Sequence, residues 1–113
     1  NSSISGTYGA ATTNYSDVTG NSDETSGTGY SSGGNTLTNV DPTTSGTTAF
    51  ADFADTSWTS ATFTTRGAII YNTNDSNSAV MIIDFGADFS VSGGTFTVEF
   101  PTAGASTAIL RIA

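Results

Sequence analysis

The amino-acid sequence predicts an all-β protein, a single antiparallel β-sandwich or jelly-roll-like domain with an extended, Gly/Ser-rich N-terminal arm. Three observations support this prediction. Residues with high helix propensity are scarce, and Leu occurs only at positions 37 and 110. The second half of the chain is rich in Thr, Val, Ile and Phe, which favour strands. A length of 113 residues fits one domain with one core.

The chain divides into two parts of different composition. Residues 1–48 are rich in Gly, Ser, Thr and Asn, and four glycines lie within residues 27–34. Hydrophobic residues occur singly in this part, which suits an extended segment anchored at intervals to a sheet or to a neighbouring subunit. We therefore expect a polar arm with short strands over residues 1–48, including one at 35–40. The β-sandwich core is expected over residues 49–113.

The second part begins with two strands and a turn. One strand is predicted over residues 61–66, and another follows closely over 68–72. Residues 73–78 are all Asn, Asp, Ser or Thr, and such residues favour turns because their side chains bond the nearby backbone. Residues 79–85 are apolar on both faces, which is typical of a strand in the middle of a sandwich.

The remaining segments predict a loop and two further strands. Residues 86–94 contain three glycines and are expected to form a longer loop, with a single turn at 87–89. Residues 95–100 alternate between apolar and polar side chains, as a half-buried strand does. A final strand is expected over 107–112. The expected core consists of apolar residues from these strands: Phe63, Ile70, Ile83, Phe85, Phe96, Val98, Phe100, Leu110 and Ile112.

The charged residues narrow the possible functions. The chain has ten carboxylates, two arginines and no Lys, His or Cys, and its formal net charge is −8. It therefore lacks imidazole bases, thiolate nucleophiles, Schiff-base lysines and the usual ligands of zinc, copper and iron. The negative charge disfavours binding to nucleic acids or anionic membranes, and no apolar run approaches the roughly 20 residues of a membrane span. These features indicate a binding or structural protein without a cofactor, not an enzyme.

Carboxylates are the only acid–base groups, and one of them lies in an apolar segment. Asp84 follows four apolar residues, where its charge would be costly without a cation. We therefore expect a structural ion pair that involves Asp84 and the two cations, Arg66 and Arg111; otherwise Asp84 faces solvent beside a turn. The competing hypothesis is a glycosidase-like acid pair with Asp88 or Glu99 as the second member.

Two further motifs are weak, and no metal site is predicted from them. Residues 72–77 offer oxygen ligands at alternate positions, but they lack the acidic residues and glycine of a calcium loop. Residues 27–34 are rich in glycine, but they lack the lysine and the flanking strand and helix of a phosphate-binding loop.

Four aromatic residues in polar surroundings are candidates for a subunit interface: Tyr8, Tyr15, Tyr30 and Trp58. Aromatic side chains bury a large area and are enriched at interfaces. The alternatives are packing on their own sheet or stacking on sugars. For Trp58 the sequence does not distinguish burial within this domain from burial at an interface.

A series of short motifs runs from residue 15 to residue 112. In order, they are Tyr15-Ser-Asp-Val-Thr, Thr25-Ser-Gly-Thr-Gly-Tyr-Ser-Ser-Gly-Gly, Thr36-Leu-Thr, Thr56-Ser-Trp-Thr, Arg66-Gly-Ala-Ile-Ile-Tyr, Ile83-Asp-Phe-Gly, Gly94-Thr-Phe-Thr-Val and Ile109-Leu-Arg-Ile. Their order and spacing resemble a group of small virion structural proteins of tailed bacteriophages. The resemblance implies a virion component more strongly than a particular position in the particle.

Composition and resemblance together lead to one expected function. We expect a capsid decoration (cement) protein on the outer capsid surface, where negative charge lies away from packaged DNA. Its expected partners are the major capsid protein and copies of itself, in a homo-oligomer. The alternative is a phage tail or fibre domain that binds a host receptor or glycan. A carboxylate-based hydrolase and a secreted adhesin or filament subunit are alternatives from other classes.

Overall fold

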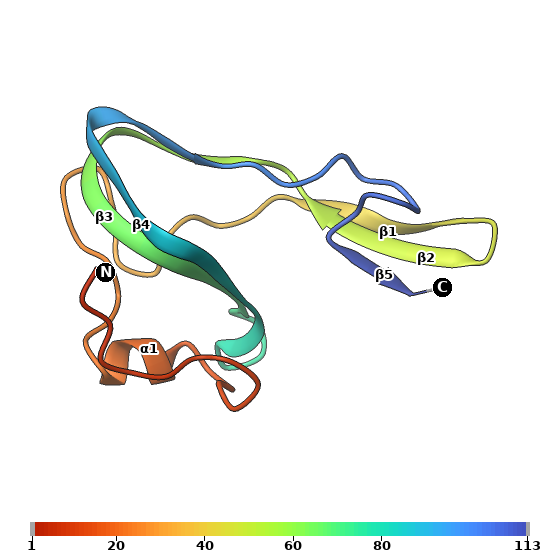
Figure 1. Cartoon of the computed structure of the whole chain (residues 1–113). Helices are drawn as coiled ribbons and strands as arrows, with labels where there is room; N and C mark the ends of the chain where they lie inside the picture. Colours follow the sequence, from red (N-terminus) through yellow and green to blue (C-terminus); the bar gives the residue numbers. More distant parts are fainter. Residues whose placement is uncertain (1, 113) are drawn as a thin grey trace.

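The computed structural model describes residues 2–112 and shows an all-β protein with two antiparallel sheets (Figure 1). The prediction of an all-β, two-sheet fold is therefore confirmed. Within the described residues the elements are α1 (Ser16–Gly20), β1 (Asn39–Ser45), β2 (Thr48–Phe53), β3 (Thr56–Asn72), β4 (Ser78–Val98) and β5 (Leu110–Ile112).

Strands β3 and β4 form one long antiparallel ribbon. The turn between them contains Ser76 and Asn77 with φ values of 50° and 62°, and the amide of Asn74 donates to Asn72 Oδ1 at 2.9 Å. The predicted polar turn is thus confirmed. The predicted break between strands 61–66 and 68–72 is wrong, because β3 continues through this point and the irregularity lies in its partner strand.

That irregularity is a wide bulge in β4. Thr65 pairs with Phe89 and Gly67 pairs with Asp84, so residues 85–88 of β4 lie opposite the single residue Arg66. The predicted loop over residues 86–94, with a turn at 87–89, is therefore wrong in extent. Pairing resumes at residue 89 and continues to the end of β4 at Val98, so the predicted strand over 95–100 is the last part of β4.

The second sheet has the strand order β1-β2-β5. The strand predicted at 35–40 begins later, at Asn39, and extends to Ser45 as β1. It pairs with β2 in this sheet. Pro42 lies in β1, which is an edge strand, where the missing amide of proline is tolerated. The last strand is shorter than the predicted 107–112, because the amides of Thr107 and Ala108 both donate to Gly104 O in a turn.

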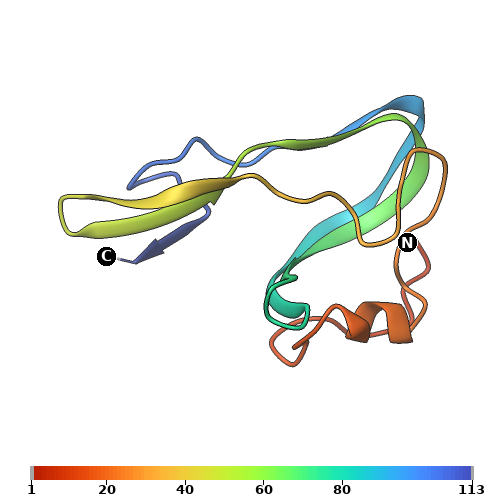
Figure 2. The same ribbon diagram turned by 180° about the vertical axis from the view of Figure 1, so that it is seen from behind.

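Figures 1 and 2 show the three-stranded sheet extending from one end of the β3–β4 ribbon. The rings of Phe53, at the end of β2, and Phe100, just after β4, lie 5.6 Å apart where the sheets meet. Helix α1 and the chain before it lie at the other end, beside the turn between β3 and β4 (Figure 1). The radius of gyration is 14.9 Å, compared with about 13 Å for a compact domain of this length. The fold is therefore somewhat extended.

The core is small. The buried hydrophobic residues of the described chain are Ala61, Phe63, Ile70 and Ala108. Of the expected core, Phe63 and Ile70 are confirmed, and a second group is only half-buried: Ile83, Phe85, Phe96, Val98 and Phe100. The prediction is wrong for Leu110 and Ile112, which are 52% and 69% exposed, because β5 contacts only β2 and no second layer covers it.

Candidate functional site: the open edge of strand β4

The outer edge of β3 is covered by the arm. The amide of Thr62 donates to Thr28 O at 2.9 Å, and Thr25 Oγ1 donates to Thr64 O at 2.6 Å. Gly27 permits this close approach, since a Cβ atom there would lie 2.1 Å from Thr62 O. The glycine-rich stretch of the arm is therefore an edge cover for β3, and its backbone bonds are made within the chain.

The outer edge of β4 is covered only at its beginning. The amide of Ala79 donates to Thr13 O at 2.9 Å, and the amide of Tyr15 donates to Asn77 O at 3.0 Å. From residue 80 to residue 98, no segment of the described chain other than β3 pairs with the backbone of β4. This stretch, which we call the open edge, presents backbone donors and acceptors that no second strand pairs with, and the amides of Gly86 and Gly93 donate to side chains.

Apolar side chains accompany the open edge. Val80 is 56% exposed and Phe89 is 50% exposed. A shallow groove lies at the start of the edge, lined by residues 79–82 of β4 and by Gly9, Ala10 and Thr12 of the N-terminal loop. Exposed backbone groups together with exposed apolar side chains are what an added strand would use.

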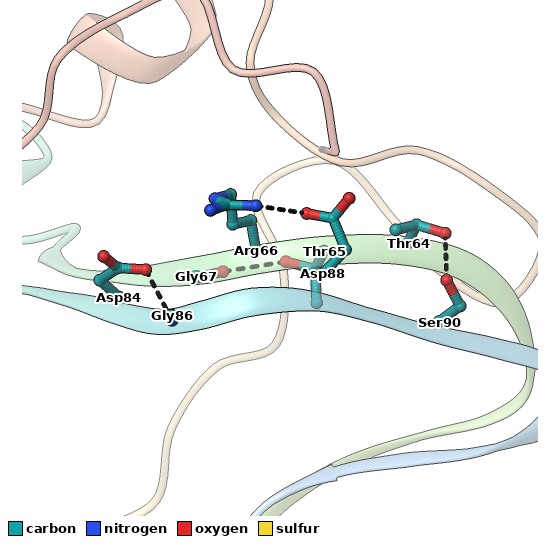
Figure 3. Close-up of polar contacts among 8 residues, drawn as sticks. All are labelled: Thr64, Thr65, Arg66, Gly67, Asp84, Gly86, Asp88 and Ser90. Atoms are coloured by element: carbon teal, nitrogen blue, oxygen red, sulfur yellow. Dashed lines mark hydrogen bonds and ion pairs between the residues drawn. The ribbon is translucent and has the colours of Figure 1, made fainter.

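The bulge is held by polar contacts between β3 and β4, which Figure 3 shows in close-up. Arg66 Nη1 lies 3.1 Å from Asp88 Oδ1, and Thr64 Oγ1 lies 2.7 Å from Ser90 Oγ. Both side chains of the ion pair are almost half exposed. The bulge therefore carries a solvent-screened ion pair, which adds modestly to stability.

The structure does not bring the three predicted ion-pair residues together. Arg66 pairs with Asp88, since the bulge places residue 88 beside it, and not with Asp84. Asp84 is exposed, and its Oδ1 accepts a hydrogen bond from the amide of Gly86 at 2.8 Å, which matches the alternative of a carboxylate beside a turn. Arg111 Nη1 donates to Ser106 O at 2.7 Å.

The four candidate interface aromatics all have contacts within the chain. The rings of Tyr15 and Tyr71 stack with centroids 4.5 Å apart, and Tyr30 lies 6.1 Å from Trp58. Tyr8 Oη donates to Asp23 at 2.6 Å. Trp58 joins an aromatic cluster of its own domain, and its Nε1 is buried without a hydrogen-bond partner among the described residues. A role for these four residues at a subunit interface stays a prediction.

Glu24 organises a cluster of tyrosines that the sequence did not predict. Its Oε1 accepts hydrogen bonds from Tyr30 Oη at 3.0 Å and from the amide of Gly33 at 2.6 Å. Tyr71 Oη donates to Gly33 O at 2.8 Å. Burial, and secondarily hydrogen bonding to Glu24, raises the pKa of Tyr15 to about 12 and also raises that of Tyr30. The hydroxyls of Tyr15 and Tyr30 are therefore protonated donors to Glu24 within the arm, and the hydroxyl of Tyr71 links this cluster to β3 through Gly33 O.

Asp23 fastens the N-terminal chain in the same way. Its carboxylate accepts hydrogen bonds from Tyr8 Oη and from the amides of Ser5 and Gly6, at 2.6 to 3.0 Å. The bond from Tyr8, followed by those from Ser5 and Gly6, lowers the pKa of Asp23 to about 2. The adjacent acidic pair Asp23–Glu24 was the only sequence signal for these two anchors.

A third carboxylate, that of Asp52, is the largest fully buried side chain among the described residues. Asp52 in β2 is 1% exposed; its Oδ1 accepts a hydrogen bond from the amide of Phe53 at 2.9 Å. Its Oδ2 is buried and has no hydrogen-bond partner among the described residues. A buried carboxylate oxygen without a partner is energetically costly, so we expect Asp52 to lower the stability of the three-stranded sheet.

Comparison with protein families, curated proteins and solved structures finds no match to this chain. Within residues 2–112, no three His, Cys, Asp or Glu side chains lie close enough together to hold a metal ion. In the same part of the chain, no helix is long and apolar enough to cross a membrane.

Proposed function

We propose that the protein is a virion structural protein, a capsid decoration (cement) protein that binds the outer capsid surface and stabilises the shell. The proposal rests mainly on the open edge of β4, which offers backbone pairing and apolar side chains to a neighbour. The protein acts mechanically, since it bridges adjacent subunits against internal pressure.

The large accessible surface supports the proposal that this protein buries more of its surface when it joins an assembly. The accessible surface is 6794 Å², compared with about 5,800 Å² for a compact monomer of this mass. The difference, about 1,000 Å², resembles the roughly 800 Å² that each partner contributes to a standard interface. A domain whose described core has four buried hydrophobic residues gains much of its stability from such contacts.

The charge and chemistry of the chain fit the same role. A net charge of −8 is compatible with the outside of a capsid, away from packaged DNA. A protein without Lys, His or Cys lacks the side chains that most often act as catalytic bases and nucleophiles. Bridging subunits requires none of these groups.

The alternative, a tail or fibre domain that binds a glycan through its aromatic side chains, has less support. The ring of Tyr15 is already stacked on Tyr71, and Trp58 packs against Phe63 and Phe96. Aromatic rings that already pack against other side chains of the domain expose less surface on which a sugar could stack.

Copy number in purified particles tests the proposal. Quantitative mass spectrometry is expected to find on the order of hundreds of copies per virion, as symmetric decoration of a capsid requires. Electron microscopy is expected to place them on the outer shell, and capsids without the protein should break at lower temperature. A count of about a dozen or fewer would favour the tail, and absence from the particle would reject both functions.

A further inference from the structure

We propose that residues 80–84 of β4 pair with the same residues of a second copy of this chain, antiparallel and about a two-fold axis at Ile82. The inference rests on the proposed function, because it names the contact between copies of the structural subunit. It can nevertheless be tested in solution, apart from any capsid.

The structure delimits this segment at both ends. On one side, the segment from Thr13 to Tyr15 already bonds to the edge at residues 77–79, so an added strand cannot extend further. On the other side, the bulge at residues 85–88 interrupts the strand, and Gly86 has a φ of 76°. Between these limits, residues 81–84 pair regularly with residues 67–70 of β3, and Val80 lies in a one-residue bulge between the pairs Ile70–Met81 and Tyr71–Ala79. This part of the open edge is the nearest to the groove.

Antiparallel pairing about a two-fold axis is self-complementary for this segment. With Ile82 opposite its own copy, Met81 lies opposite Ile83, and Val80, in the bulge that ends the regular stretch, comes beside Asp84. Four of the five residues are apolar, and Val80 is 56% exposed in the single chain. The two copies therefore cover apolar surface that the monomer leaves in water.

The charges of the segment permit this register. Two copies of net charge −8 repel, so pairing requires that carboxylates do not meet across the axis. In this register the two Asp84 residues are four residues apart along the strands, about 14 Å, which exceeds the Debye length of about 8 Å at physiological salt. Asp88, the next carboxylate in β4, is neutralised by Arg66 at 3.1 Å.

Pairing also solves a problem of sheet stability. A two-stranded ribbon is marginally stable alone, whereas three or more strands form a stable sheet. The proposed contact joins two ribbons into a four-stranded sheet, with each β3 edge covered by its own arm. Natural edges are commonly protected by Lys, Pro or an inward charge, and residues 80–83 contain none of these.

Charge substitutions at Val80 test the register by sedimentation equilibrium of the full chain. Val80→Asp places a carboxylate beside Asp84 twice in each dimer, and the dissociation constant is expected to rise at least about tenfold. Val80→Lys places a cation there instead, and the constant is expected to fall or stay unchanged. Phe89→Asp and Phe89→Lys are matched controls, because residue 89 is similarly exposed on the same strand but beyond the bulge. They change the net charge equally and should shift the constant by no more than about twofold.

Three results would each overturn the pairing. The wild-type chain could stay monomeric up to about millimolar concentration. Alternatively, Asp could change the dissociation constant equally at positions 80 and 89, or Asp and Lys could change it equally at position 80. Circular dichroism of the Val80→Asp monomer checks that its fold is retained.

Binding to purified capsids separates this inference from the proposed function. If the wild-type chain stays monomeric and Val80→Asp weakens only binding to capsids, the open edge binds the capsid protein and the pairing between copies is rejected. A dimer with the expected charge pattern that binds no capsid supports the pairing and rejects the proposed function.

Discussion

Arg66 and Asp88 face each other across the bulge of the β3–β4 ribbon, with 3.1 Å between Nη1 and Oδ1 (Figure 3). Arg66 is the single β3 residue opposite four residues of β4, and its partner is the last of those four. The ion pair therefore links the two strands where their regular pairing is interrupted. Its side chains are 45% and 42% exposed, so solvent screens the attraction.

Arg66→Ala is expected to lower the free energy of unfolding by less than about 1 kcal/mol, since exposed ion pairs contribute little. Urea denaturation of Arg66→Ala, Asp88→Asn and the double variant measures the coupling between the two residues. A single loss of about 2 kcal/mol or more would show that Arg66 has a structural role beyond this pair.

The bulge shows how far the sequence could predict this region. Gly86 and Gly93 correctly indicate irregular backbone, and both have positive φ values. The sequence could not distinguish a loop from a bulge, because that depends on whether the partner strand resumes pairing at residue 89. The ion pair was mispredicted for the same reason: its partner is set by the register between strands, which no local pattern reveals.

The core prediction succeeded where a covering layer exists and failed where it does not. Alternation along a strand identifies its two faces, but it does not show whether anything packs on either face. Phe63 is buried because Tyr30 and Trp58 pack around it, whereas Leu110 and Ile112 have no such neighbours on the described chain. The anchors at Asp23 and Glu24 were missed because they join residues far apart in a segment without periodicity.

Asp23 makes the attachment of the N-terminal chain dependent on pH. Its pKa is lowered from 3.8 to about 2 in the folded protein. The ionised carboxylate therefore stabilises the fold fully above about pH 4, and this contribution is lost as the pH falls through about 2. The amide NMR signals of Ser5 and Gly6 are expected to shift with a midpoint near pH 2.

Asp23→Asn is the control for this titration. It removes the charged acceptor, so the shift of the Ser5 and Gly6 amides near pH 2 should disappear, and both amides should exchange faster with solvent. A midpoint close to the ordinary pKa of 3.8 in the wild-type protein would mean that these hydrogen bonds are not formed in solution.

Two glycine substitutions are expected to have opposite effects on stability. Gly27→Ala places a Cβ atom 2.1 Å from Thr62 O, at a backbone φ of 153°, and should lower the free energy of unfolding by roughly 1–3 kcal/mol. Gly20→Ala, in α1, meets no atom within 4 Å and should be neutral or stabilising by up to about 1 kcal/mol. Thermal denaturation compares the two, and equal stability of both variants would show that the arm does not lie against β3.

Asp52 offers a route to a more stable protein. Asp52→Asn keeps an oxygen that can accept the hydrogen bond from the amide of Phe53, and it removes a charge from a side chain that is 1% exposed. A neutral amide costs less to bury than a carboxylate without a cation, so we expect the free energy of unfolding at pH 7 to rise by about 1–2 kcal/mol. Urea denaturation measures the change, with Asp41→Asn, an exposed carboxylate on β1, as the matched control. A loss of stability for Asp52→Asn, with Asp41→Asn unchanged, would show that the buried carboxylate has a favourable partner in solution.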